Sequence, residues 1–133
     1  MRVVFLDTVG LIALWDRTDQ WHDAAVRAKA PIDVPNVRAV TTTFVLLECG
    51  NAAARKPYRP DVGVLRQEMA RESDLIVPTD DDVEEAWAAY LRGEAGDAGI
   101  VDHVSFVVMR RLGITDAFTN DHHFKAAGFN TLF

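Results

Sequence analysis

The chain begins with a short apolar run that ends on an acid. The residues from Val3 to Leu6 are all apolar, and Asp7 follows at once. A run of this length without polar alternation is typical of a strand buried on both faces, as in a parallel sheet. We therefore expect a central strand over residues 2–6. Ligands bind beyond the carboxyl ends of such strands, so Asp7 is expected at the functional edge of the sheet.

Strand-like and helix-like patterns alternate along the rest of the chain. Apolar and β-branched residues predict further strands over 37–42, 75–77, 114–119 and 130–133. Helical patterns cover 8–15, 19–29, 44–54, 61–72, 79–91, 102–111 and 121–127. Asp19 is expected to cap the second helix and Gly113 to end the sixth. This alternation predicts an α/β fold with a mainly parallel central sheet of four to five strands, flanked by helices on both faces.

Length and composition fit a single globular domain over residues 1–133. The chain is 49% hydrophobic and has one cysteine, Cys49, which excludes an internal disulfide and a zinc site built from clustered cysteines. The acid at position 7 interrupts the apolar start too early for a signal peptide. No stretch approaches the roughly 20 apolar residues of a membrane span. We expect a cytoplasmic protein without membrane association.

The formal net charge of −6, from 20 acidic and 14 basic residues, argues against a nucleic-acid-binding surface of the usual basic kind. This objection weakens if four acids, Asp7, Glu48, Asp102 and Asp121, are set aside as ligands of cations. The acidic count then falls from 20 to 16 against 14 basic residues, which leaves a charge of −2. Bound divalent ions would offset that remainder, so charge does not exclude a nucleic-acid substrate.

The same four acids occupy positions that an α/β sheet would bring together in one cleft. Neighbouring carboxylates raise each other's pKa unless a cation neutralises them. Mg²⁺ binds through a few carboxylates together with waters and substrate phosphates. The pattern therefore predicts a metal site that acts on phosphate, with one ion at Asp7 and Asp102 activating water. A second ion near Glu48 and Asp121 would stabilise the leaving oxygen, and the sequence leaves one and two ions open.

Each of these acids also has a simpler explanation. Asp7, Asp102 and Asp121 each precede a helical pattern, and an acid in that position often serves only as an N-cap. Glu48 lies within a helical pattern, where a glutamate is ordinarily a surface residue. Capping and metal binding are compatible, so the joint placement of the four acids carries the metal-site interpretation.

Four short segments around these acids resemble the motifs of PIN-domain ribonucleases. They are Asp7-Thr8 after the first strand, Glu48-Cys-Gly-Asn51, Val101-Asp102-His-Val-Ser105-Phe106 and Thr119-Asn-Asp121-His-His-Phe124. They follow one another in the family's order over nearly the whole chain, and they are most similar to those of the VapC toxins of prokaryotic toxin–antitoxin pairs. One departure is that many relatives have Ser where this chain has Thr8 or Val9. Thr8 keeps the hydroxyl group.

The resemblance implies a PIN-like three-layer domain that uses Mg²⁺, with Mn²⁺ as the alternative, to hydrolyse single-stranded RNA. It makes the four acids the catalytic and metal-binding residues. The polar groups expected to orient them are Thr8, Asn51, Ser105 and Thr119. It also implies an antitoxin protein as partner and a homodimer, with the Trp21 region and residues 57–60 as candidate contact surfaces. The alternative function is a catalytically silent PIN module that binds a protein or RNA partner.

Other polar residues near these motifs receive more modest interpretations. Asp97 lies in a glycine-containing loop and is either an outer ligand or, as favoured, a solvated loop acid. Asp116 is interpreted as a turn or surface group. His122 and His123 could touch RNA, but adjacent side chains on a helix point about 100° apart, which makes them a poor pair of metal ligands. Packing is their favoured role. A haloacid-dehalogenase-type phosphatase is disfavoured because it needs a second Asp where this chain has Val9.

Overall fold

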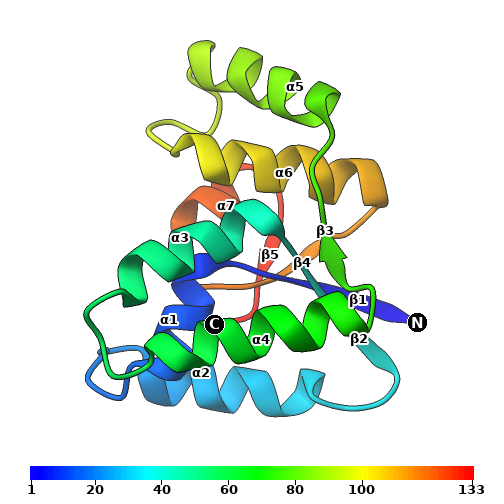
Figure 1. Cartoon of the computed structure of the whole chain (residues 1–133). Helices are drawn as coiled ribbons and strands as arrows, with labels where there is room; N and C mark the ends of the chain where they lie inside the picture. The colour runs from blue at the N-terminus through cyan, green and yellow to red at the C-terminus, as the bar shows by residue number, and fades with distance from the viewer.

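The computed structural model describes all 133 residues and contains one five-stranded sheet with helices on both faces (Figure 1). The strands are β1 (Arg2–Leu6), β2 (Val37–Thr42), β3 (Leu75–Ile76), β4 (Asp116–Phe118) and β5 (Asn130–Thr131). The helices are α1 (Thr8–Trp15), α2 (His22–Lys29), α3 (Thr43–Ala53), α4 (Arg59–Arg71), α5 (Asp80–Leu91), α6 (Ile100–Leu112) and α7 (His122–Ala126), and a 3₁₀ turn (Ala30–Ile32) follows α2. The expected α/β class is confirmed. None of the helices is both long enough and apolar enough to cross a membrane.

The sheet is parallel throughout, with the strand order β3-β2-β1-β4-β5. β1 lies at its centre, and Val4 and Phe5 have no exposed surface, which confirms the buried strand expected from the apolar run. Leu6 at the end of β1 is in register with Phe118 at the end of β4. On the other side, the Thr41 hydroxyl donates a hydrogen bond to the Leu6 carbonyl oxygen at 2.6 Å. The residues that follow β1, β2 and β4 therefore emerge at one edge of the sheet.

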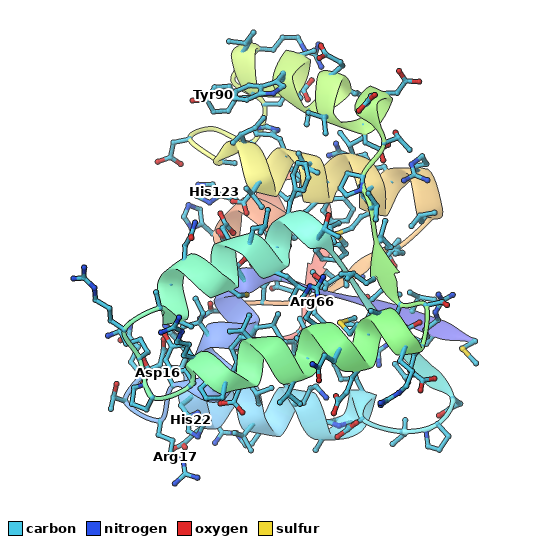
Figure 2. All side chains as sticks on the ribbon, in the orientation of Figure 1. Asp16, Arg17, His22, Arg66, Tyr90 and His123 are labelled. Carbon is cyan, nitrogen blue, oxygen red and sulfur yellow. The ribbon has the colours of Figure 1, made fainter.

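Helices cover both faces of this sheet. In the view of Figure 1, α2 and α4 lie in the lower half, and α6 lies in the upper half with α5 packed outside it. α2 is joined to α1 by a hydrogen bond of 2.8 Å between His22 Nδ1 and the Ala13 carbonyl oxygen, and His22 is labelled in Figure 2. α5 is joined to α6 by a pair of hydrogen bonds of 2.9 and 2.7 Å from the Arg111 guanidinium to the Asp82 carboxylate.

Three of the expected helix starts are wrong. α4 begins at Arg59, two residues earlier than expected, with Pro60 in its first turn, a position that proline tolerates. α2 begins at His22, because the Asp19 carboxylate instead accepts a hydrogen bond from the Trp21 backbone N–H at 2.8 Å. This local turn competes with helix formation, as short polar side chains often do. α6 begins after Gly99, so Asp102 lies inside the first turn and is not the cap. Gly113 does end α6, in the left-handed conformation (φ 70°) that glycine adopts without steric cost.

α1 packs directly on the backbone of β4. A Cβ atom added at Gly10 would clash with the Phe118 carbonyl oxygen and would lie 2.8 Å from the carbonyl carbon. Only glycine allows this approach, because it has no Cβ atom. The Asp7 backbone N–H also donates a hydrogen bond to the Phe118 carbonyl oxygen at 3.4 Å. The start of α1 is thus fixed against the end of β4, which sets the position of Asp7 relative to the residues after β4.

Candidate active site

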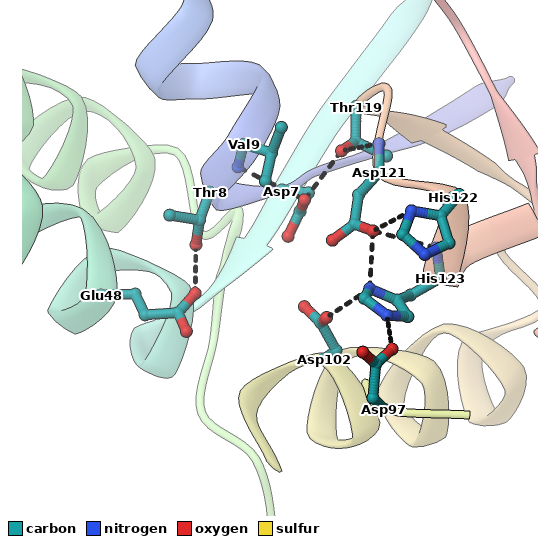
Figure 3. A network of polar contacts seen from close by, with 10 residues as sticks. All are labelled: Asp7, Thr8, Val9, Glu48, Asp97, Asp102, Thr119, Asp121, His122 and His123. Carbon is teal, nitrogen blue, oxygen red and sulfur yellow. Dashed lines mark hydrogen bonds and ion pairs between the residues drawn. The ribbon is translucent and has the colours of Figure 1, made fainter. Parts of the chain in front are cut away.

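Asp7 lies where β1 ends and α1 begins, and only 1% of the residue is exposed. Its Oδ2 accepts a hydrogen bond of 2.8 Å from the Thr119 hydroxyl and one of 3.3 Å from the Val9 backbone N–H (Figure 3). Asp7 is therefore the N-cap of α1 and at the same time a member of the acidic cluster. The two interpretations of Asp7 that the sequence offered do not exclude each other.

Thr119 connects Asp7 with Asp121. While its hydroxyl donates to Asp7, the same oxygen accepts a hydrogen bond from the Asp121 backbone N–H at 3.1 Å. Asp121 in turn caps α7, since its Oδ1 accepts a hydrogen bond of 2.9 Å from the backbone N–H of His123. One threonine thus holds the residues after β1 and β4 in a fixed relation.

Asp102 approaches the cluster from the first turn of α6, with 17% of its side chain exposed. Burial first, and then the charge of Asp121, raises the pKa of Asp102 to about 7. The charge of Glu48 also raises it. Burial, followed by the charge of Asp102, raises the pKa of Asp7 to about 8. These carboxyl groups lie close enough to oppose each other's ionisation.

Glu48 lies on the other side of Asp7 from Asp121 in the view of Figure 3. It comes from α3, and its Oε1 accepts a hydrogen bond of 2.6 Å from the Thr8 hydroxyl. Thr8 therefore holds Glu48 on one side of Asp7, and Thr119 holds Asp7 and the backbone of Asp121 on the other. No lysine or arginine forms an ion pair with any of the four acids.

The remaining residues expected to support the site behave differently. The Ser105 hydroxyl is buried without a hydrogen-bond partner, and Asn51 is exposed on α3 without a side-chain hydrogen bond to the acids. Asp116 accepts hydrogen bonds from Arg2 at 3.0 Å and from Asn130 at 3.1 Å, so it joins neighbouring strands away from the cluster. The structure thus brings together the four acids with Thr8 and Thr119, but not Ser105, Asn51 or Asp116.

The sequence interpretation missed the contacts that His123 makes with three acids. Its Nδ1 lies 2.8 Å from Asp121 Oδ1 and 3.9 Å from Asp102 Oδ2, while its Nε2 lies 2.6 Å from Asp97 Oδ1 (Figure 3). The hydrogen bond with Asp97, more than the charge of Asp121, raises the pKa of His123. The favoured packing role for this histidine was wrong. The sequence signal for these contacts was the position of His123, two residues after Asp121 and in the first turn of the helix that Asp121 caps.

Comparison with known proteins identifies the family. The chain is 31% identical over 132 residues to the 23S rRNA-specific endonuclease VapC20 of Mycobacterium tuberculosis, a match that covers 96% of this chain and 95% of the relative. The crystal structure of M. tuberculosis VapC20 superposes with a TM-score of 0.78 over 95% of each chain.

Two further structures extend the agreement at the level of the fold. FitAcB from Neisseria gonorrhoeae superposes with a TM-score of 0.64 at 12% identity, over 96% of this chain and 95% of that chain. FitAB bound to a DNA fragment also gives a TM-score of 0.64, at 14% identity, over 96% of this chain and 92% of that chain. No protein-family model matches the sequence. The extent and identity of the VapC20 match, together with the fold it shares, show that the chain belongs to the VapC family of PIN-domain endoribonuclease toxins.

Proposed function

We propose that this toxin hydrolyses RNA phosphodiester bonds with the help of a divalent cation, Mg²⁺ or Mn²⁺, held by Asp7, Glu48, Asp102 and Asp121. The observation that carries the proposal is the burial of Asp7 beside Asp102, which raises the pKa of Asp7 to about 8. Burying a carboxyl group next to other acids is costly. A cation supplied from outside the chain would reverse that cost.

The donor set fits such a cation. The four acids offer carboxylate oxygens, the ligands that Mg²⁺ and Mn²⁺ prefer, and no lysine or arginine of the chain forms an ion pair with them. Asp102, Asp121 and His123 each present a ligand atom within 4.8 Å of the others. Retention of all four acids also favours an enzyme over the silent binding module.

The chain's own groups have distinct parts in the proposed reaction. Thr119 orients Asp7, and Thr8 orients Glu48, through the hydrogen bonds described above. When bound, a divalent cation lowers the pKa of the attacking water and offsets the charge of the phosphate oxygens. Asp7 and Asp102 would hold a cation on the side of the attacking water, and Glu48 and Asp121 would hold one on the side of the leaving oxygen. Negative charge on these acids repels phosphate, and a bound cation would remove that repulsion.

The relative's specificity indicates a substrate. That relative is named as a 23S rRNA-specific endonuclease, and its crystal structure is described as that of a sarcin-ricin loop cleaving toxin. We therefore propose an unpaired loop of ribosomal RNA as the target of this chain. Arg55 and Lys56 in the turn between α3 and α4, and Arg59 at the start of α4, are exposed and suited to hold the flanking phosphates.

The proposed partners follow from the toxin family. An antitoxin would silence the enzyme by placing a cationic side chain among the four acids, where a guanidinium group can bind two carboxylate oxygens. We also propose a cytoplasmic homodimer, with Trp21, 48% exposed, at one candidate contact surface and residues 57–60 at another.

Cleavage of defined RNAs by the purified protein tests the enzymatic proposal. The wild type should cut a sarcin-ricin loop hairpin with Mg²⁺ or Mn²⁺ and lose activity in excess chelator. Asp7→Asn should fold and show no detectable cleavage. Asp81→Asn, which changes an exposed acid on α5, is the matched control and should cleave like the wild type.

Two results would contradict this account. Undiminished cleavage in chelator would refute the requirement for a metal. Equal cleavage of the hairpin and of an unrelated RNA of the same length would refute the proposed substrate. Growth after induced expression provides a cellular readout, since the wild type should arrest growth and Asp7→Asn should not.

A further inference from the structure

His123 connects the acidic cluster to Asp97 in the loop between α5 and α6. Its side chain is 18% exposed, so the imidazole is largely enclosed. Nε2 lies 2.6 Å from Asp97 Oδ1, in the loop between α5 and α6. Nδ1, on the other side of the ring, lies 2.8 Å from Asp121 and 3.9 Å from Asp102. One ring thus has a carboxylate at each nitrogen.

The two nitrogens of a neutral imidazole have different roles. One carries a hydrogen and donates it, and the other offers a lone pair. If Nε2 donates its hydrogen to Asp97, the Nδ1 lone pair faces the carboxylate oxygens of Asp121 and Asp102. Three electron-pair donors from different residues then converge on the same space, within 4.8 Å of one another. That arrangement suits a metal ion.

Asp97 supplies an independent reason for this orientation. Its side chain is 93% exposed, and its one side-chain hydrogen bond is the one to His123. A histidine that binds a metal usually donates its other ring N–H to a carboxylate, which fixes the ring and makes it a better ligand. The pair of Asp97 and His123 has this form. The favoured interpretation of Asp97 as a merely solvated acid does not account for the contact.

We propose that His123 is a nitrogen ligand of the catalytic metal, together with Asp102 and Asp121, and that Asp97 orients it. Imidazole nitrogen favours transition metals, whereas Mg²⁺ prefers oxygen ligands alone. The site therefore selects Mn²⁺ and related ions over Mg²⁺. This inference rests on the proposed metal dependence and adds to it the choice of ion and the residue that makes the choice.

The neighbouring histidine provides a matched control. His122 stacks on His123, with ring centroids 4.2 Å apart, but 82% of its side chain is exposed. Its Nδ1 lies 4.0 Å from Asp121, farther than the corresponding atom of His123. Replacing either histidine with phenylalanine keeps a ring and removes both nitrogens. The substitution should therefore weaken metal binding at position 123 and leave it unchanged at position 122.

Metal affinities of the full-length protein, measured by calorimetry with Mn²⁺ and Mg²⁺ separately, test the proposal without using activity. The wild type should bind Mn²⁺ more tightly than Mg²⁺. His123→Phe should weaken Mn²⁺ binding by about 10- to 100-fold and Mg²⁺ binding by much less, and Asp97→Asn should weaken Mn²⁺ binding by about tenfold. His122→Phe should change neither affinity. Pulsed electron paramagnetic resonance of bound Mn²⁺ should show nitrogen coupling that is lost only in His123→Phe.

The outcomes separate this inference from the function on which it rests. Mn²⁺ binding with no nitrogen coupling in the wild type would overturn the inference and leave the metal-dependent enzyme intact. Equal loss of Mn²⁺ and Mg²⁺ affinity in His123→Phe would also overturn the selectivity. Failure of the wild type to bind either ion would overturn both proposals. Asp97→Asn keeps the test decisive if His123→Phe does not fold, because Asp97 is an exposed loop residue.

Discussion

Replacing Asp7 with asparagine should stabilise the metal-free protein, and the gain should grow with pH. The folded-state pKa of about 8 lies above the ordinary value of 3.8. Folding therefore favours the protonated form. The stability that this preference contributes is fully present below pH 3.8 and is lost as the pH rises towards 8. Asparagine has nearly the same shape and no charge, so it escapes this loss.

The size of the effect follows from the two pKa values. At pH 7, about three units above the unfolded value, the loss is about 4 kcal/mol, because each unit corresponds to about 1.4 kcal/mol. At pH 5, about one unit above it, the loss is about 1.5 kcal/mol. Asparagine also changes the hydrogen bonds with Thr119 and Val9, but that change is the same at both pH values. The difference between the two gains, about 2.5 kcal/mol, therefore isolates the ionisation of Asp7.

Urea unfolding in excess chelator at pH 5 and pH 7, followed by tryptophan fluorescence, measures both gains. Asp81→Asn is the control, since it removes an exposed acid from α5 and should gain equally little at both pH values. A gain for Asp7→Asn that is the same at pH 5 and pH 7 would show that the buried carboxyl group does not resist ionisation. The argument for a cation at this site would then lose its main support.

Three further predictions concern other parts of the molecule. Asp102→Asn should be as stable as the wild type or more stable in chelator, with a smaller rise in melting temperature on adding Mn²⁺; unfolding of this variant would make Asp102 a structural residue. Gly10→Ala should destabilise the protein by about 3 kcal/mol in urea titrations, because its Cβ meets the Phe118 backbone, and a near-neutral effect would contradict that packing. Asp82→Ala should lower the free energy of unfolding by about 1 to 3 kcal/mol in the same assay, since it removes the hydrogen bonds with Arg111 and the capping box at the start of α5. That contribution should be lost in the wild type as the pH falls, because the hydrogen bonds with Arg111 lower the pKa of Asp82.

The fold was predictable where the sequence pattern is local. β1, α1 and β2 have the boundaries expected from the apolar run and the β-branched segment that follows. The strand expected over 114–119 is shorter in the structure, at Asp116–Phe118, and α2 starts three residues later than expected. These ends depend on which neighbour satisfies a backbone group. For example, the hydrogen bond from the Trp21 backbone to Asp19 delays α2, and a periodic pattern carries little information about such choices.

The site was predictable to the extent that strand ends determine it. Asp7 and Asp121 follow β1 and β4, and parallel neighbouring strands bring them to the same edge. The partnership of His123 with Asp97 was not predictable in this way. Asp97 lies in the loop before α6, and its hydrogen bond with His123 in α7 depends on the path of that loop. Helical spacing describes the directions of His122 and His123, but it says nothing about a carboxylate from a distant loop.

The stability cost at Asp7 also predicts competition between metal and antitoxin. Any cation that binds the folded cluster stabilises the protein by mass action, whether it is a divalent ion or a guanidinium group from a partner. Both would neutralise the same carboxylates, so their stabilising effects cannot add. Mn²⁺ should raise the melting temperature of the free toxin, and should raise that of the toxin co-purified with its antitoxin much less. Asp7→Asn should reduce the rise in the free toxin, because it removes one proposed ligand of the metal, and should change the already small rise in the complex little. Equal rises in the free and complexed wild type would mean that the partner leaves the acids accessible and inhibits in another way.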